Sequence, residues 1–280
     1  MIRLLTPHPA IMVESGERVM LAADIHLGLE YELAKQGINI PYQWSRMLGE
    51  MVGLLTEYKP DRLILLGDVK HGVPATSFKE KREIPNFFNT LLEYVENIDV
   101  ARGNHDANIQ KFLPEEVTLH SSKGVIFGDE FTVAGFHGHA WPAPEIMSVD
   151  CIIMAHNHPT VMLKTPIGLM ISQRAWIRGK LDQKKVAKAF LEQDGITVGE
   201  NPVEEFKKNF IVTPKKPELI IMPMFNDLLG GLPVNMESPQ SLLGPLFNSG
   251  AVNLEKFDSY LLDGTYLGKV EFLRTQLENY

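Results

Sequence analysis

The first hundred residues alternate short apolar runs with segments of helical periodicity, and this alternation most restricts the fold. The apolar runs 18–23, 62–66 and 98–101 are typical of short buried strands. Between them, apolar residues at helical spacing predict helices over 42–59, which Pro60 ends, and over 85–97. This strand–helix–strand–helix–strand order predicts a sheet that is at least partly parallel.

The sequence pattern of the second half of the chain differs from that of the first, because it indicates shorter strands separated by turns. We predict these strands at 117–119, 124–128, 131–135, 150–155, 160–163 and 168–171. Helices at 181–192 and 271–279 and strands at 219–222 and 266–270 follow, whereas 202–217 is typical of a polar, basic connection. Because no repeat, low-complexity tract or linker is visible, we expect residues 1–280 to form one domain with two sheets, in which 202–280 completes or caps the structure.

Composition narrows the class of protein. With 44% hydrophobic and 22% charged residues, the 280-residue chain resembles an average globular protein and is long enough to bury a core. Its net charge of −8 excludes a uniformly basic nucleic-acid coat but not a local basic groove. The single Cys151 cannot form an internal disulfide, and neither a signal-peptide pattern nor an apolar run of about 18 residues occurs. We therefore expect a cytoplasmic protein without a membrane partner.

Side chains that carry chemistry stand directly after the predicted strands. These motifs are Asp24-Ile25-His26, Gly67-Asp68, Gly103-Asn104-His105-Asp106, His137-Gly138-His139 and Ala155-His156-Asn157-His158. Each motif alone is ordinary for a turn. Because functional groups collect at the carboxyl ends of parallel strands, we expect the five motifs to meet at one edge. Their carboxylates, imidazoles and amide together indicate a site for divalent metal ions.

This ordered set of motifs resembles the calcineurin-like metallophosphoesterase superfamily, over residues 24–158. The resemblance implies an α/β fold, a four-layer αββα sandwich with two mixed sheets. Residues 24–28 with Glu30, and residues 67–71, resemble more closely the archaeal phosphoesterases related to the SbcD-type nuclease subunit of double-strand-break repair. Bacterial relatives of that branch include the ligase-associated DNA damage response endonuclease. Its late Pro-(Ala/Met)-Phe element and Gly pair are similar to 223–225 and 230–231 here.

The resemblance also implies a role for each motif residue. One ion would be held by Asp24, His26, Asp68 and His158, and a second by Asp68, Asn104, His137 and His156, with Asp68 bridging the two. His105 would contact the scissile phosphate without binding metal. Ala155 departs from the glycine usual in the superfamily, but it removes no ligand. This donor set suits Mn²⁺, Fe²⁺, Ni²⁺ or Zn²⁺ better than Ca²⁺, and Mn²⁺ is the working choice by analogy, with Mg²⁺ also open.

These roles predict a phosphoester hydrolase, most specifically a phosphodiesterase or nuclease acting on DNA or RNA. Hydroxide bridging two ions about 3.5–4 Å apart would attack phosphorus in line. His105, protonated, would stabilise the developing charge or protonate the leaving oxygen. The repair relatives often work with an ATPase or helicase partner. The alternatives are hydrolysis of a nucleotide, cyclic nucleotide or phosphomonoester, and a non-catalytic interaction module. The presence of every ligand position and of His105 argues against the module.

For several residues near the motifs, the sequence leaves two alternative roles open. Asp106 either holds the His105 imidazole or caps a helix, and Lys70 and His71 either contact substrate phosphate or lie in a solvated loop. His139 either lines the pocket as a substrate contact or is a surface histidine, and Trp141 either lines the pocket or serves as core or loop anchor. Lysines in the second half either follow a phosphate backbone or form solvated faces, namely Lys184, Lys185, Lys188, Lys207, Lys208, Lys215 and Lys216. We expect structural roles for His8 and His120.

Overall fold

Two β-sheets organise the computed structural model, which describes the chain except residues 42, 73–79, 237–243 and 279–280. The first sheet follows chain order: β1 (Ile2–Leu4), β2 (Ile11–Ser15), β3 (Glu17–Ala22), β4 (Arg62–Leu65), β5 (Asn97–Ala101) and β6 (Val117–His120). Strands β1 to β3 are antiparallel, and β3 to β6 are parallel. The predicted parallel arrangement of the first three apolar runs is therefore confirmed.

The second sheet is also mixed and takes its strands from the rest of the chain. Its order is β13 (Leu232–Pro233), β10 (Pro159–Lys164), β11 (Met170–Lys180), β12 (Glu218–Ile221), β9 (Cys151–Met154), β8 (Val133–Phe136) and β7 (Val125–Phe127). Strand β14 (Asp258–Leu261) pairs with β11, and β15 (Tyr266–Lys269) pairs with β14. Strands β8, β9 and β12 run parallel, so their carboxyl ends share one edge.

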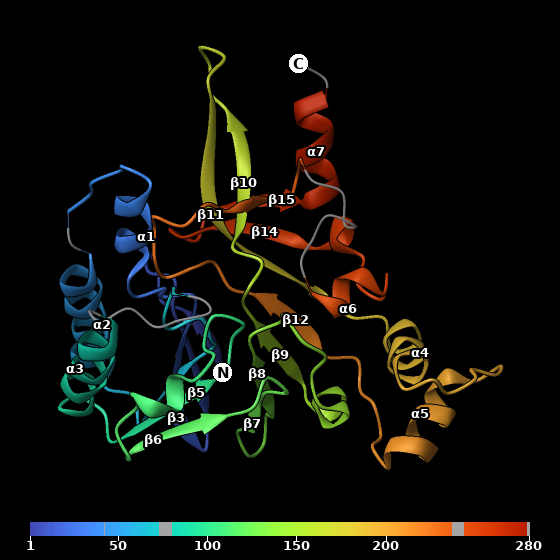
Figure 1. Cartoon of the computed structure of the whole chain (residues 1–280). Helices are drawn as coiled ribbons and strands as arrows, with labels where there is room; N and C mark the ends of the chain where they lie inside the picture. The colour runs from blue at the N-terminus through green and yellow to red at the C-terminus, as the bar shows by residue number, and fades with distance from the viewer. Residues whose placement is uncertain (42, 73–79, 237–243, 279–280) are drawn as a thin grey trace.

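Helices cover the outer faces of both sheets, and this layering confirms the predicted four-layer sandwich. Helices α2 (Trp44–Tyr58) and α3 (Glu80–Leu92) pack on the first sheet, after the short α1 (Leu29–Lys35). The second sheet carries α4 (Gln183–Gln193), α5 (Pro202–Phe210), α6 (Pro245–Asn248) and α7 (Val270–Glu278). Figure 1 shows the layers in sequence, from α2 and α3 on the left through the two sheets to α4 and α5 on the right.

Alternation along the strands explains why two sheets stack. In β3, Val19 and Leu21 lie in the apolar layer shared with Ile153 of β9, whereas Met20 and Ala22 pack toward α2 and α3. Successive side chains of a strand point to opposite faces, so a strand that is apolar at every position needs cover on both faces. The buried runs of the sequence therefore encode an interior position between a helix layer and a second sheet.

The structure corrects several predicted elements. Strand β11 continues to Lys180 instead of ending near 171, because Ser172, Gln173 and Arg174 interrupt its apolar pattern while its backbone still pairs with β10. Helix α3 includes Pro85 in its interior instead of beginning there. The connection predicted at 202–217 contains α5, whose Asn201 side chain accepts a hydrogen bond from the Glu204 amide. Positions 42 and 279 of the predicted helices lie outside the described residues.

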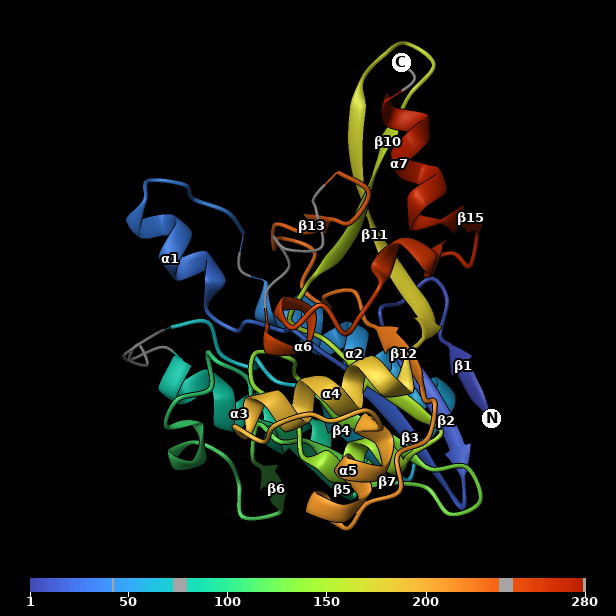
Figure 2. The same cartoon turned by 90° about the vertical axis from the view of Figure 1, so that its right-hand side faces the viewer.

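Some segments had no predicted element at all, including β1, β2, β13, β14, α1 and α6. Strands β10 and β11 form a ribbon that extends beyond the sandwich, with α7 nearby (Figures 1 and 2). The described helices include none with both the length and the apolar character needed to cross a membrane.

Candidate metal centre

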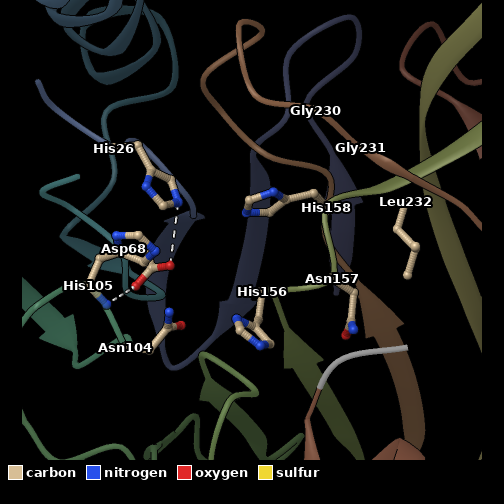
Figure 3. A pocket seen from close by; sticks show the side chains of 10 residues that line it. All are labelled: His26, Asp68, Asn104, His105, His156, Asn157, His158, Gly230, Gly231 and Leu232. Atoms are coloured by element: carbon tan, nitrogen blue, oxygen red, sulfur yellow. Dashed lines mark hydrogen bonds and ion pairs between the residues drawn. The ribbon is translucent and has the colours of Figure 1, made fainter. Parts of the chain in front are cut away.

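The five sequence motifs meet where strands of the two sheets end. Asp24, Asp68 and Asn104 follow the parallel strands β3, β4 and β5, while His137 and His156 follow β8 and β9. Figure 3 shows side chains from both sheets around one pocket, with His26 and His158 facing each other across it. The cavity measures about 300 Å³, and its lining is His26, Asp68, Asn104, His105, His156, Asn157, His158, Gly230, Gly231 and Leu232.

The backbone around this pocket adopts unusual conformations. Among the described residues, eight non-glycine positions have a positive φ, and five of them carry candidate ligands: Asp24, His26, Asp68, His156 and His158. A left-handed conformation at such a residue costs on the order of 1–3 kcal/mol and persists only where the surroundings enforce it. Such strain gathers at functional sites, because it turns side chains away from the direction that the strand would give them.

Two motif glycines allow the loops to approach closely. A Cβ atom on Gly67 would lie 2.6 Å from His137 Nδ1, and one on Gly103 would lie 2.2 Å from Asp68 Oδ1. Gly67 also has a φ of +75°, which disfavours other residues. The glycines of the Gly-Asp and Gly-Asn-His-Asp motifs are therefore steric requirements for bringing Asp68 against its neighbours.

The first half of the centre contains buried groups that lack hydrogen-bond partners. Asp24 Oδ1, His26 Nε2 and His158 Nε2 are all buried without a hydrogen bond, and the Asp24 Oδ1–His158 Nε2 distance is 3.4 Å. Burial lowers the pKa of His26 to about 3, so its ring is neutral at pH 7 and has a free lone pair. His26 Nε2 lies 3.4 Å from Asp68 Oδ2. These unsatisfied electron-pair donors fit a divalent cation.

The second half is centred on His137, which is fully buried. Its Nδ1 donates a hydrogen bond to the Leu66 carbonyl at 2.8 Å. Its Nε2 faces Asp68 Oδ2 at 3.3 Å, Asn104 Oδ1 at 3.1 Å and His156 Nδ1 at 3.0 Å. Burial opposes a charged His137, yet the carboxylates of Asp68 and Asp24 outweigh it and raise its pKa to about 9. The same acceptors would hold a divalent cation in place of that proton.

Asp68 belongs to both halves. Its Oδ2 approaches His26 and His137, while its Oδ1 accepts a hydrogen bond from the His105 amide at 2.8 Å. Burial opposes its ionised form, but His137 and the other hydrogen-bond partners outweigh it and lower the pKa of Asp68. Three groups of side chains are close enough together to hold a metal ion, and the two that contain an aspartate lie side by side: Asp24–His26–His158 and Asp68–His137–His156. The third group, His26–His71–His105, contains histidines alone.

His105 lines the same pocket but takes a different role in the hydrogen bonding. Its Nδ1 donates to the His71 carbonyl at 2.7 Å, so its Nε2 is left to face other groups. The His71 ring stacks on the His105 ring with centroids 5.3 Å apart and planes at 22°. Residue 71 thus fixes the orientation of His105 through a hydrogen bond to its carbonyl and stacking on its ring.

Two of the predicted roles are wrong. Asp106 does not hold the His105 imidazole, because its carboxylate is fully buried and accepts hydrogen bonds from the backbone amides of Gly103, Val69 and Lys70. It ties the β4 and β5 loops together. Lys70 lies neither at the pocket rim nor in a solvated loop, since its side chain is fully buried and Nζ donates to the Gly72 carbonyl.

His71, His139 and Trp141, whose roles the sequence left open, have the following positions. His71 is half-buried, with Nδ1 3.0 Å from His26 Nδ1. His139 stands 5.3 Å from the His137 ring and is not among the pocket-lining residues. Trp141 packs on Phe190 of α4 at 5.1 Å, which favours loop anchoring.

Two of the seven candidate lysines form ion pairs, and the two histidines expected to be structural each pair with a carboxylate. Lys188 and Lys215 form ion pairs with Glu192 and Asp150. Lys184, Lys185, Lys207, Lys208 and Lys216 are exposed and lie on or near α4 and α5. His8 pairs with Glu50, and His120 pairs with Asp99, both outside the pocket.

The lining includes residues to which the sequence assigned no site role. Gly230, Gly231 and Leu232 come from the C-terminal quarter of the chain, and Asn157 lies between the two histidines of its motif. The Gly pair was visible as a sequence feature, but its position beside His158 depends on tertiary packing.

Comparison with known proteins agrees with this geometry. The family model for calcineurin-like phosphoesterases matches residues 17–206, more than two thirds of the chain. The chain belongs to the calcineurin-like phosphoesterase family. The family uses a dinuclear metal site, and the two His/Asp groups described above fit such a site. Membership implies a hydrolase that acts on phosphoesters.

One of the similar solved structures supports the fold, and a second matches part of the chain. The crystal structure of Pseudomonas putida nuclease MPE shares 17% identity over 92% of this chain and 91% of its own, with a TM-score of 0.51. Yfce, a phosphoesterase from E. coli, shares 19% identity over 52% of this chain and 73% of its own, with a TM-score of 0.34. No curated protein matches the sequence significantly.

Proposed function

We propose that this calcineurin-like phosphoesterase is a metal-dependent phosphodiesterase that cleaves nucleic acid. The observation that carries the proposal is the position of Asp68 Oδ2 between His26 of one His/Asp group and His137 of the other, with His105 lining the same pocket. Asp24, His26, Asp68 and His158 would hold one divalent cation. Asp68, Asn104, His137 and His156 would hold the second.

The residues of this chain perform distinct tasks in the proposed reaction. When bound, two divalent cations neutralise phosphate charge and lower the pKa of water enough to supply a nucleophile near neutral pH. The Leu66 carbonyl orients His137, and the His71 carbonyl orients His105. Because Nδ1 of His105 is the donor in that bond, a proton on Nε2 can stabilise charge on the phosphate or pass to the leaving oxygen. Such assistance typically contributes about 10²–10⁴-fold to the rate.

Fewer observations support nucleic acid as the substrate than support phosphoester hydrolysis in general. The resemblance of residues 24–28 with Glu30, and of residues 67–71, to the SbcD-related branch supports DNA or RNA as the substrate, with a role in DNA repair. Pseudomonas putida MPE, a structure of similar fold, is named a nuclease. The exposed lysines on α4 and α5 offer local positive charge despite the net charge of −8. The proposed metal is Mn²⁺, and the proposed partner is an ATPase or helicase. We place the protein in the cytoplasm.

The test is Mn²⁺-dependent cleavage of end-labelled single-stranded DNA and RNA, with the His105→Ala variant measured alongside. We expect a ladder of products from at least one polymer, greatly reduced in the variant. If the protein binds two Mn²⁺ ions yet cleaves neither polymer, the nuclease proposal fails. The net charge of −8 would then favour a small phosphoester as the substrate, because an acidic surface does not attract a long polyanion.

A further inference from the structure

A C-terminal segment, residues 223–232, lies against the loop that carries the Asp-x-His motif. The amides of Phe225 and Asn226 donate to the carbonyls of Ala23 at 2.8 Å and Asp24 at 3.3 Å. The Asn226 side chain continues the series, because Nδ2 donates to the Ile25 carbonyl at 3.0 Å. Three consecutive carbonyls of the ligand loop are therefore bound by two adjacent residues of this segment.

These carbonyls need hydrogen-bond donors from elsewhere, because residues 23–25 lie beyond the end of β3 and outside its ladder of hydrogen bonds. Ala23, Asp24 and Ile25 are completely buried, and a buried carbonyl without a hydrogen bond is costly. Asp24 and His26 also have positive φ values of 55° and 47°, so the loop needs external support to keep this shape. The hydrogen bonds from residues 225 and 226 provide that support directly at the motif.

The orientation of the Asn226 amide is determined by its second contact. Asn226 is completely buried, and its Oδ1 accepts a hydrogen bond from the Leu228 amide at 3.0 Å. The oxygen is therefore committed to its own segment, and the NH₂ group must face Ile25. An aspartate would present an oxygen to the Ile25 carbonyl, and an alanine would present nothing.

The other end of the segment contacts the second ligand loop of the same half of the centre. The Leu232 amide donates to the His158 carbonyl at 3.0 Å, and a Cβ on Gly231 would lie 2.9 Å from that oxygen. Arg174 of β11 holds the segment from outside by donating to the carbonyls of Met224 and Phe225 at 3.1 and 3.3 Å. One segment thus supports the loops of Asp24, His26 and His158.

We propose that Asn226 is a positioning residue for the first metal ion and that residues 223–232 act as a clamp on that ion's ligands. This inference rests on the proposed function, because it takes the Asp24–His26–His158 group as a metal site. In the other half, the Leu66 carbonyl orients His137 from outside the clamped loop, whereas the His156 amide donates to Asp24 Oδ2 of that loop at 3.2 Å. Loss of the clamp should therefore weaken one ion much more than the other.

The test measures Mn²⁺ binding to the full-length protein by titration calorimetry and equilibrium dialysis. For Asn226→Ala we expect one of two ions to bind about 10–100-fold more weakly, the usual effect of losing a group that orients a ligand, and the other to change little. The variants His26→Ala and His156→Ala identify which ion is lost, because each removes a ligand from only one half.

Asn235→Ala is the matched control. Asn235 is 1% exposed and, like Asn226, binds backbone through both amide atoms, to the nitrogen and oxygen of Met162 at 2.8 and 2.9 Å. It contacts no ligand loop through these bonds. It should lose thermal stability to a similar extent while both Mn²⁺ affinities remain those of the wild type, which separates positioning from general stability.

A second variant keeps the test decisive if Asn226→Ala folds poorly. Arg174→Ala retains Asn226 and removes only the outer hold on the segment, so the same ion should weaken by a smaller factor. Wild-type affinities for both ions in Asn226→Ala or, if it does not fold, in Arg174→Ala would overturn the clamp. So would equal weakening of both ions. A wild-type protein that bound no Mn²⁺ would instead overturn the proposed metal centre and the clamp with it.

Discussion

Replacing Gly103 by alanine tests how closely the β4 and β5 loops must approach. The new Cβ would lie 2.2 Å from Asp68 Oδ1 and 2.3 Å from the Asp68 amide nitrogen, whereas ordinary contacts begin at 3.4 Å. Rotating the Asp68 side chain relieves only the first clash, so the two loops must separate by about 1 Å. A displacement of that size in a catalytic group costs roughly 10²-fold in rate. We therefore expect about a hundredfold loss of turnover and weaker binding of both Mn²⁺ ions.

The assay for Gly103→Ala is hydrolysis of the model phosphodiester bis(p-nitrophenyl) phosphate, together with Mn²⁺ titration. Gly49→Ala is the control, because a Cβ at this exposed position in α2 meets nothing within 4 Å. That control should keep full activity and gain up to about 1 kcal/mol of stability from better helix propensity. Turnover and Mn²⁺ affinity of Gly103→Ala within threefold of wild type would refute the steric argument.

Two further predictions concern stability. Asp106→Asn places an NH₂ group against backbone amides that now donate to the carboxylate, so urea denaturation should show a loss of about 1–3 kcal/mol; an unchanged midpoint would contradict this. Burial opposes the ionised form of Asp99, but hydrogen bonds from His120 and Arg62 outweigh it and lower its pKa. This carboxylate therefore stabilises the fold above its unfolded pKa of about 3.9 and ceases to do so as the pH falls through the lower folded value. The stability of Asp99→Asn, measured between pH 6 and 2, should fall less steeply than that of wild type, and parallel curves would count against it.

The layered fold was predictable because its signals are local. The runs 18–23, 62–66 and 98–101 are apolar at nearly every position, which requires burial on both faces, and the intervening helices follow from apolar spacing. Strand β11 and helix α5 were harder, because polar residues break the apolar run of the first and dominate the second. Strand β11 is stabilised by pairing with the neighbouring β10 and the distant β12, and helix α5 by packing against α4.

The site shows the same division between local and tertiary information. The candidate ligands stand at strand ends in the sequence, so their convergence follows from the topology. The actual contacts of Asp106 and Lys70 depend on how two loops pack, which their spacing does not reveal. Asn226 lies 200 positions from the Asp-x-His loop that it contacts, and its neighbours in sequence carry no sign of that contact.

The measurement that tests the central claim most directly compares wild type and His105→Ala at equal Mn²⁺ occupancy, with bis(p-nitrophenyl) phosphate as substrate. We predict two Mn²⁺ ions per chain in both proteins and a turnover about 10²–10⁴-fold lower in the variant, because His105 lines the pocket but is not among the residues proposed to hold either ion. Equal turnover in the two proteins, or no Mn²⁺-dependent hydrolysis in the wild type, would contradict the assignment of this pocket as a phosphodiesterase centre.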